Sequence, residues 1–270
     1  MDIRLGSHVG SKGSVLKTIQ TLPICFKTCQ IFLGSPQSVN VRTISSTEKK
    51  DINTFCEEND FRFYVHAPYV INISNEKNSF VLKKLIEQVT GIPAGIVYHI
   101  GCHKDKDLGI KRVTDYINEL DLPANVLPNK LLLENCAGSG NGIGGSWDEI
   151  RQVFEKLDTS KVALCIDTQH SFASGICSWQ EEKEILNFFD TADEVADIQC
   201  IHLNDSKVAF NSKKDRHEVV GKGYIWSKDT SGLKLLTEIA TERNIDLICE
   251  TSDFGECLTC MANNGIISLD

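Results

Sequence analysis

Short apolar segments recur along the whole chain and alternate with segments of helical periodicity. Eight apolar runs span residues 2–6, 29–33, 61–66, 95–99, 130–134, 162–167, 198–202 and 246–250. Continuous apolar runs of this length are typical of strands that are buried on both faces of a parallel sheet. Between the third and fourth runs, Val81, Leu82, Leu85 and Val89 recur at the three- to four-residue spacing of an amphipathic helix.

Eight strands alternating with helices predict an α/β protein, a (β/α)8 TIM barrel that forms one domain over residues 1–270. An open, doubly wound parallel sheet is the alternative that the pattern leaves. Residues 45–50 are polar, and we expect them to open a helix rather than to join two domains.

Composition excludes several classes of protein. The chain is 41% hydrophobic and 24% charged, which is ordinary for a soluble globular protein. It has neither a signal-like N-terminal segment nor an apolar run long enough to span a membrane, so we expect no membrane partner and no secretion. Several of the 11 cysteines lie inside apolar runs, which favours reduced thiols in an intracellular compartment. The net charge of −9 has the wrong sign for binding nucleic acid by bulk charge.

The C-terminal ends of six apolar runs carry side chains that bind metals or transfer protons. These residues are His66, His99, Glu134, Asp167, His202 and Glu250. In a barrel of parallel strands these ends meet at one rim, where active sites are built. A buried charged group needs a partner, so six such groups at one rim indicate a shared site.

Three further candidates lie in loops. Asp215 and His217 are two residues apart, so in extended backbone both point the same way. His170 can face the site of Asp167 only if the chain turns directly after Asp167. Together, five histidines and four carboxylates suit zinc, with manganese or iron as possible substitutes, and suffice for three ions. We expect His8, at the end of the first strand, to contact a ligand side chain.

The motifs around these residues resemble those of endonuclease IV, the zinc-dependent apurinic/apyrimidinic endonucleases of the xylose-isomerase-like TIM-barrel superfamily. The resemblance extends from about Gly6 to Glu250. The matching segments are His66-Ala-Pro-Tyr69-Val70, His99-Ile-Gly101, Glu134-Asn-Cys-Ala-Gly138, Asp167-Thr-Gln-His170, His202-Leu-Asn-Asp-Ser-Lys207, Asp215-Arg-His217 and Glu250-Thr251.

The resemblance implies a role for each of the nine residues in a cluster of three zinc ions. His66 and His99 would hold the first zinc, and Glu134 would bridge it to the second. Asp167, His202 and Glu250 would complete the second site, and His170, Asp215 and His217 would hold the third. Glu134 and Glu250 would be catalytic, because a hydroxide shared by the first two ions and oriented by Glu250 is the implied nucleophile.

The resemblance also implies contacts with double-stranded DNA. Tyr69 and Val70 match residues that insert at the abasic site, although Tyr69 packing on a neighbouring loop is an equal alternative. Lys207 and Arg216 lie within motifs and are expected to contact phosphates. Gln37 stands where the family usually has an arginine, so this intercalating contact differs.

The implied activity is cleavage of the DNA phosphodiester 5′ to an abasic site, leaving a 3′-OH, together with removal of blocked 3′ ends. We expect a monomer located in the cytoplasm or wherever the genome is repaired. A metal-dependent sugar isomerase or epimerase of the same superfamily is the alternative enzyme. A zinc-stabilised DNA-binding scaffold is the alternative without catalysis.

Overall fold

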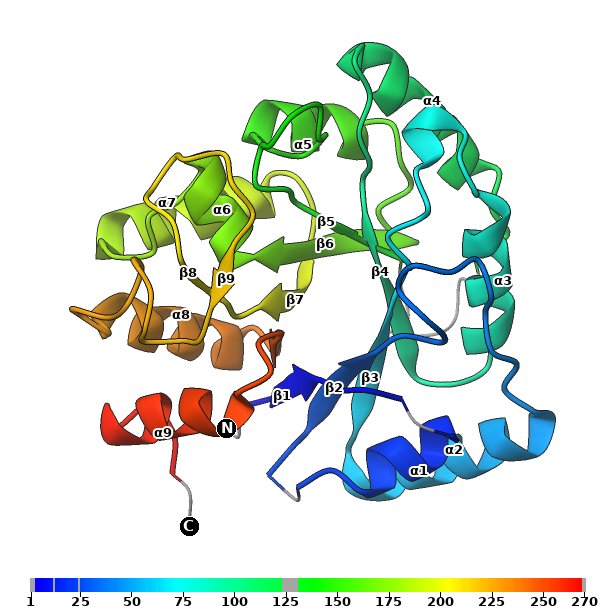
Figure 1. The fold of residues 1–270 in the computed structure, drawn as a ribbon, viewed down its shortest axis with the longest axis horizontal. Helices are drawn as coiled ribbons and strands as arrows, with labels where there is room; N and C mark the ends of the chain where they lie inside the picture. Colours follow the sequence, from blue (N-terminus) through cyan, green and yellow to red (C-terminus); the bar gives the residue numbers. More distant parts are fainter. Residues whose placement is uncertain (1–2, 12, 24, 123–130, 269–270) are drawn as a thin grey trace.

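A closed barrel of eight parallel strands forms the centre of the molecule, so the predicted (β/α)8 barrel is confirmed and the open sheet is wrong (Figure 1). The computed structural model describes residues 3–11, 13–23, 25–122 and 131–268. The strands follow the order β1-β10-β7-β6-β5-β4-β3-β2 around the barrel. They are β1 (Leu5–His8), β2 (Thr28–Ile31), β3 (Arg62–His66), β4 (Ala94–His99), β5 (Leu131–Glu134), β6 (Val162–Asp167), β7 (Ile198–His202) and β10 (Asp246–Cys249).

The first strand is displaced from the predicted run. β1 begins at Leu5 and ends at His8, whereas the apolar run covered residues 2–6. Pairing with β10 and β2 decides this, because Ser7 pairs with Cys249 and His8 pairs with Gln30. Polar residues therefore continue the strand and carry His8 to the rim. Residues 2 and 130, which began two predicted runs, lie outside the described residues.

Helices surround the strands (Figure 1). They are α1 (Val15–Gln20), α2 (Ser46–Asn59), α3 (Phe80–Val89), α4 (Lys106–Asn118), α5 (Trp147–Phe154), α6 (Thr168–Ser174), α7 (Glu182–Asp193), α8 (Ser231–Glu242) and α9 (Phe254–Asn263), with a short 3-10 turn, η1 (Ile73–Asn75). Residues 45–50 open α2 as predicted, because the Ser45 hydroxyl accepts a hydrogen bond from the Glu48 backbone N–H. Within the described part of the chain, every helix is too short or too polar to cross a membrane.

Alternation along the strands directs the rim residues inward. The barrel interior is filled by a separate cluster of buried side chains: Tyr64, Val97, Leu132, Ala163, Cys165, Cys200 and Ile248. Residues two apart in a strand point to the same face. Six members of this cluster stand two residues before His66, His99, Glu134, Asp167, His202 and Glu250. These six candidates therefore form the next layer of the barrel interior, at its C-terminal end.

The opposite end of the barrel carries a largely buried ion pair. The Arg62 guanidinium donates to Asp246 Oδ1 at 2.8 Å, and the Tyr64 hydroxyl donates to Asp246 Oδ2 at 2.7 Å. These contacts join β3 to β10 across the barrel. In this fold the N-terminal end of the barrel usually serves stability, while the C-terminal end carries the chemistry.

Candidate metal centre

Two imidazoles and one carboxylate form the first group of the site. His66 Nε2 and His99 Nε2 each lie 3.4 Å from Glu134 Oε2. Glu134 is 1% exposed, and its Oε2 has no hydrogen-bond partner among the described residues. A buried carboxylate oxygen without a hydrogen bond is costly. Because three nitrogen or oxygen donors converge on this point, the residues present fit a divalent cation.

His202 lies at the centre of the second group. Its Nδ1 is 3.2 Å from Glu134 Oε1, 3.4 Å from Glu250 Oε2 and 4.0 Å from Asp167 Oδ2. Glu134 thus offers one oxygen to each of two neighbouring groups, as a bridging ligand would. The position is consistent with the bridging role that the resemblance implies for Glu134.

The third group gathers around Asp215. The sequence analysis placed all three of its residues in loops, but His170 lies in α6 and His217 begins β9, so only Asp215 is a loop residue. His170 Nε2 is 3.4 Å from Asp215 Oδ2, and His217 Nε2 is 3.3 Å from Asp215 Oδ1. His217 Nε2 also lies 3.5 Å from Asp167 Oδ2, so Asp167 stands between the second and third groups. The chain turns after Asp167 as required, since this residue caps α6 and its Oδ1 accepts from the His170 N–H at 2.8 Å.

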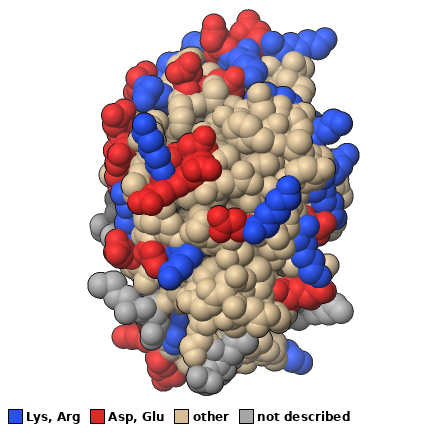
Figure 2. All heavy atoms as spheres, turned by 90° about the vertical axis from the view of Figure 1, so that its left-hand side faces the viewer, with Lys and Arg blue, Asp and Glu red and all other residues tan. Residues whose placement is uncertain are grey.

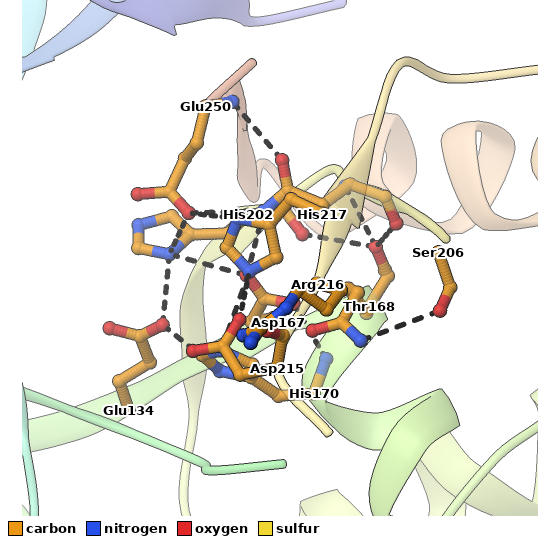
Figure 3. A network of polar contacts seen from close by, with 12 residues as sticks. Glu134, Asp167, Thr168, His170, His202, Ser206, Asp215, Arg216, His217 and Glu250 are labelled. Atoms are coloured by element: carbon orange, nitrogen blue, oxygen red, sulfur yellow. Dashed lines mark hydrogen bonds and ion pairs between the residues drawn. The ribbon is translucent and has the colours of Figure 1, made fainter. Parts of the chain in front are cut away.

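All nine candidate ligands therefore meet at one rim. Figure 3 labels Glu134, Asp167, His170, His202, Asp215, His217 and Glu250 among them. Three sets have ligand atoms within 4.8 Å of one another and could each hold an ion: His66, His99 and Glu134; Glu134, Asp167 and His202; Asp167, His170 and His217. Figure 3 shows the side chains of Glu134, His202 and Glu250 pointing toward a common centre, from β5, from β7 and from the residue that follows β10.

A fourth set lies below the rim and competes for His202. It comprises Cys165, Cys200 and His202, all wholly buried. Burial, reinforced by Cys200, raises the pKa of the Cys165 thiol well above its usual value. Since the thiolate is the form that binds a metal, this set is a poorer site than the three above it.

Two histidines are oriented by backbone carbonyls. His66 Nδ1 lies 2.7 Å from the Ala67 carbonyl oxygen, and His170 Nδ1 lies 3.0 Å from the Asn135 carbonyl oxygen. A carbonyl only accepts, so each Nδ1 carries a proton, and when the ring is neutral each Nε2 keeps its lone pair for the site. Ligating histidines usually have such an outer partner.

Side-chain amides that the sequence analysis missed complete the surroundings of the ligands. Asn204 donates to Asp167 Oδ2 at 2.7 Å and to Glu250 Oε2 at 3.0 Å. Gln30 donates to Glu250 Oε1 at 2.8 Å and contacts His8 Nδ1 at 3.0 Å. His8 Nδ1 itself is 3.7 Å from Glu250 Oε1, in line with its predicted contact to a ligand. A glutamine inside an apolar run was the available signal for Gln30.

Strand pairing closes the loop that carries Asp215 and leads into His217, and a buried carboxylate anchors the segment that follows it. β8 (Asp205–Ser206) and β9 (His217–Glu218) pair antiparallel at the two ends of this segment. The Asp205 carboxylate accepts from the backbone N–H groups of Gly221, Gly223, Ile225 and Trp226. A Cβ at position 223 would lie 2.4 Å from Asp205 Oδ1, so only glycine fits there.

Proton sharing between imidazoles and carboxylates sets the electrostatics of the metal-free site. Burial alone would raise the pKa of Glu134, but His99, His202 and His170 hold it well below its usual value. Burial alone would lower the pKa of His202, but Glu250 and Glu134 hold it well above its usual value. Cation binding requires neutral imidazoles, so it would release protons from this site.

The predicted DNA contacts separate into two places. Tyr69, Val70 and Arg216 line the same cavity as most of the candidate ligands, and this cavity has a volume of about 710 Å³. Lys77 also lines this cavity, and the sequence analysis did not single it out. Lys207 instead lines a neighbouring cavity of about 910 Å³ with Phe210 and Tyr224.

Gln37 and Tyr69 belong to loops that are tied to each other. Gln37 is exposed, and the preceding residue, Pro36, accepts a hydrogen bond from the Tyr69 N–H at 2.9 Å. The Tyr69 ring meets the Phe32 ring edge-on, with centroids 5.6 Å apart, yet 54% of Tyr69 remains exposed. Tyr69 therefore packs on the neighbouring loop and still presents its ring to the cavity.

Comparisons with known proteins agree with this arrangement. Residues 25–258 match the family model described as xylose isomerase-like TIM barrel. A Halothermothrix orenii protein named probable endonuclease 4 is 35% identical over 245 residues, covering 86% of this chain and 88% of that protein. Endonuclease IV from Thermus thermophilus superposes with a TM-score of 0.77, at 24% identity, over 92% of each chain. A D-tagatose 3-epimerase-like protein superposes with a TM-score of 0.68, at 15% identity, over 97% of this chain and 96% of its own.

The chain is therefore a xylose isomerase-like TIM-barrel protein. The 35% identity to the Halothermothrix orenii protein extends over most of both chains, so within this class the chain belongs to the endonuclease IV family. The resemblance drawn from the rim motifs is confirmed at this level. The two structural similarities fall below 25% identity and bear on the fold alone.

The titration of Asp215 tests the third group directly. Burial opposes its ionisation, but a hydrogen bond from His170 and the charges of His170 and His217 lower its pKa to about 2, from 3.8. The folded pKa is depressed, so this carboxylate contributes stability above about pH 4 that is lost as the pH falls toward 2. Carbon NMR of the metal-free protein should record this pKa, and His170→Gln should raise it toward 3.8. His103→Gln, in another loop, should leave it unchanged. An unshifted pKa in the starting protein would contradict the observed grouping.

Proposed function

We propose that the chain is a zinc-dependent apurinic/apyrimidinic endonuclease. It would cleave the DNA phosphodiester 5′ to an abasic site, leave a 3′-OH, and also remove blocks from 3′ ends. The observation that carries the proposal is the buried Glu134 Oε2, which lacks a hydrogen bond in the described structure and faces His66 and His99 among nine converging ligand-type side chains. Membership of the endonuclease IV family supports the reaction class.

The chemistry required is the hydrolysis of an unreactive anionic diester. Bound zinc would lower the pKa of water to about 7 and neutralise charge on the attacking and leaving oxygens. His66 and His99 would hold the first ion, Asp167, His202 and Glu250 would hold the second, and His170, Asp215 and His217 would hold the third. Glu134 would join the first two sites through its two oxygens. Glu250, whose Oε2 faces His202 at 3.4 Å, would orient the attacking water.

Local charge at the rim explains how an acidic chain could bind DNA. The described residues on the face shown in Figure 2 mix Lys and Arg with Asp and Glu, so bulk charge does not mark a DNA surface there. Three divalent cations would outweigh the four carboxylates of the site, and bound ions dominate the field around them. Arg216 and Lys77, which line the same cavity, add positive charge at its walls. Lys207 in the neighbouring cavity would extend the contact along the phosphate backbone.

The third group of ligands favours a nuclease over a sugar epimerase. The epimerase-like structure shares the fold across nearly the whole chain, so the barrel itself does not discriminate. Isomerisation typically needs fewer ions and a group that shuttles a proton. A third site built from His170, Asp215 and His217 has no evident role in that reaction, whereas a leaving alkoxide benefits from a further cation.

Glu134→Gln tests the proposed activity. The amide would keep the volume of the side chain but lose the charge that joins the first two sites, so incision of an abasic-site duplex should fall by more than about 100-fold, the upper range for changes around a metal ligand. A nicking assay in zinc-containing buffer and a circular dichroism spectrum would record activity and folding. Glu87→Gln, on the exposed side of α3, should retain full activity. Near-normal incision by Glu134→Gln would rule out the proposed role.

Tyr69→Ala tests recognition of the lesion. If the exposed ring fills the space left by the missing base, its loss should weaken binding to abasic DNA by about 5- to 100-fold, the range for stacking on an aromatic ring. Binding to an intact duplex should change far less. Phe80→Ala, which removes a ring of 48% exposure on α3, serves as the matched control in the same fluorescence-anisotropy titrations. Equal losses on both duplexes would refute an inserting role.

A further inference from the structure

Gln30 makes three polar contacts at the centre of the metal site. It lies in β2, is 0% exposed, and points into the barrel beside the second group of ligands. Its Oε1 is 2.9 Å from His202 Nε2, and its Nε2 is 2.8 Å from Glu250 Oε1 and 3.0 Å from His8 Nδ1. A side-chain amide has one acceptor atom and two N–H donors, so these contacts engage the acceptor and both donors.

The partners determine which way the amide points. An ionised Glu250 can only accept hydrogen bonds, so it must face the amide nitrogen. The amide oxygen then faces His202 and must accept a hydrogen bond from His202 Nε2–H. A neutral imidazole with its proton on Nε2 keeps the lone pair on Nδ1. His202 Nδ1 is the atom that faces Glu134 at 3.2 Å and Glu250 Oε2 at 3.4 Å.

The hydrogen bond from Gln30 to Glu250 also gives the two oxygens of Glu250 different surroundings. Oε1 is held by Gln30, while Oε2 faces His202 and receives the Asn204 amide at 3.0 Å. Gln30 therefore orients two neighbours at once, so that the Nδ1 lone pair of His202 and Oε2 of Glu250 face each other at 3.4 Å. His66 and His170 obtain their orientation from backbone carbonyls, so among these three histidines only His202 depends on a replaceable side chain.

We propose that Gln30 is a positioning residue that fixes the tautomer of His202 and the rotamer of Glu250, and thereby forms the second zinc site. The inference rests on the proposed metal centre. It assigns Gln30 no contact with the DNA or with the reacting atoms. Outer partners of ligating histidines typically account for about 10- to 100-fold in metal affinity.

The test is the zinc affinity of the full chain measured by competition with a chromophoric chelator. Gln30→Met keeps the volume of the side chain but removes all three contacts, and Gln30→Asn keeps the amide but is too short to span His202 and Glu250. Thr28→Val is the matched control, because Thr28 is 0% exposed, lies two residues earlier on the same face of β2, and its hydroxyl has no hydrogen-bond partner in the described structure.

The expected result is three zinc ions on the unaltered chain and on every variant, with one of the three bound about 10- to 100-fold more weakly in both Gln30 variants. The other two affinities, and all three in Thr28→Val, should stay within about threefold, well below the loss expected for an outer partner. If folded Gln30 variants bound all three ions with the affinities of the unaltered chain, the inference would be overturned and the nuclease proposal would stand. An equal loss at all three sites, which marks damage to the scaffold, would have the same consequence. Failure of the unaltered chain to bind zinc would overturn both proposals.

Discussion

The charge of Glu134 is the constraint on which the rim of the barrel depends. Burying an ionised carboxylate costs several kcal/mol unless partners compensate it. Oε1 faces His202 and His170, but Oε2 has no hydrogen bond in the described structure and only faces two imidazoles at 3.4 Å. Those separations are longer than good hydrogen bonds. A cation between the donors would satisfy the oxygen, so the fold places a charge where a metal ion stabilises it best.

The barrel positions this carboxylate through the alternation of inward and outward side chains along each strand. Leu132 fills the interior two residues before Glu134, and Cys200 does so two residues before His202. The strands then end, so the next inward side chains meet at the rim instead of in the apolar core. Asp215 and His217 cannot be placed by this rule. The pairing of β8 with β9 closes the loop before His217, and Asp205 anchors the segment after it by accepting backbone N–H groups.

The sequence alone indicated much of this arrangement. Apolar runs identified the strands, and their last residues identified six side chains that meet at the rim, because burial on both faces and the two-residue repeat leave a clear pattern. The first strand was misplaced, since Ser7 and His8 are polar and only pairing with β10 and β2 makes them strand residues. Gln30 and Asn204 were missed because their partners are set by the barrel's closure: Gln30 meets His202 and Glu250, which lie 172 and 220 positions away. Lys207 lies in a motif yet lines a different cavity, since the motif fixes its backbone and not its side chain.

The location of bound zinc tests the account most directly. Crystals grown with zinc and measured at the zinc absorption edge would reveal each ion by its anomalous signal, independently of any activity. The account predicts three ions at the rim, one of them bound to Glu134 Oε2 together with His66 and His99. An absence of signal beside Glu134, with the nine side chains placed as they are here, would contradict it.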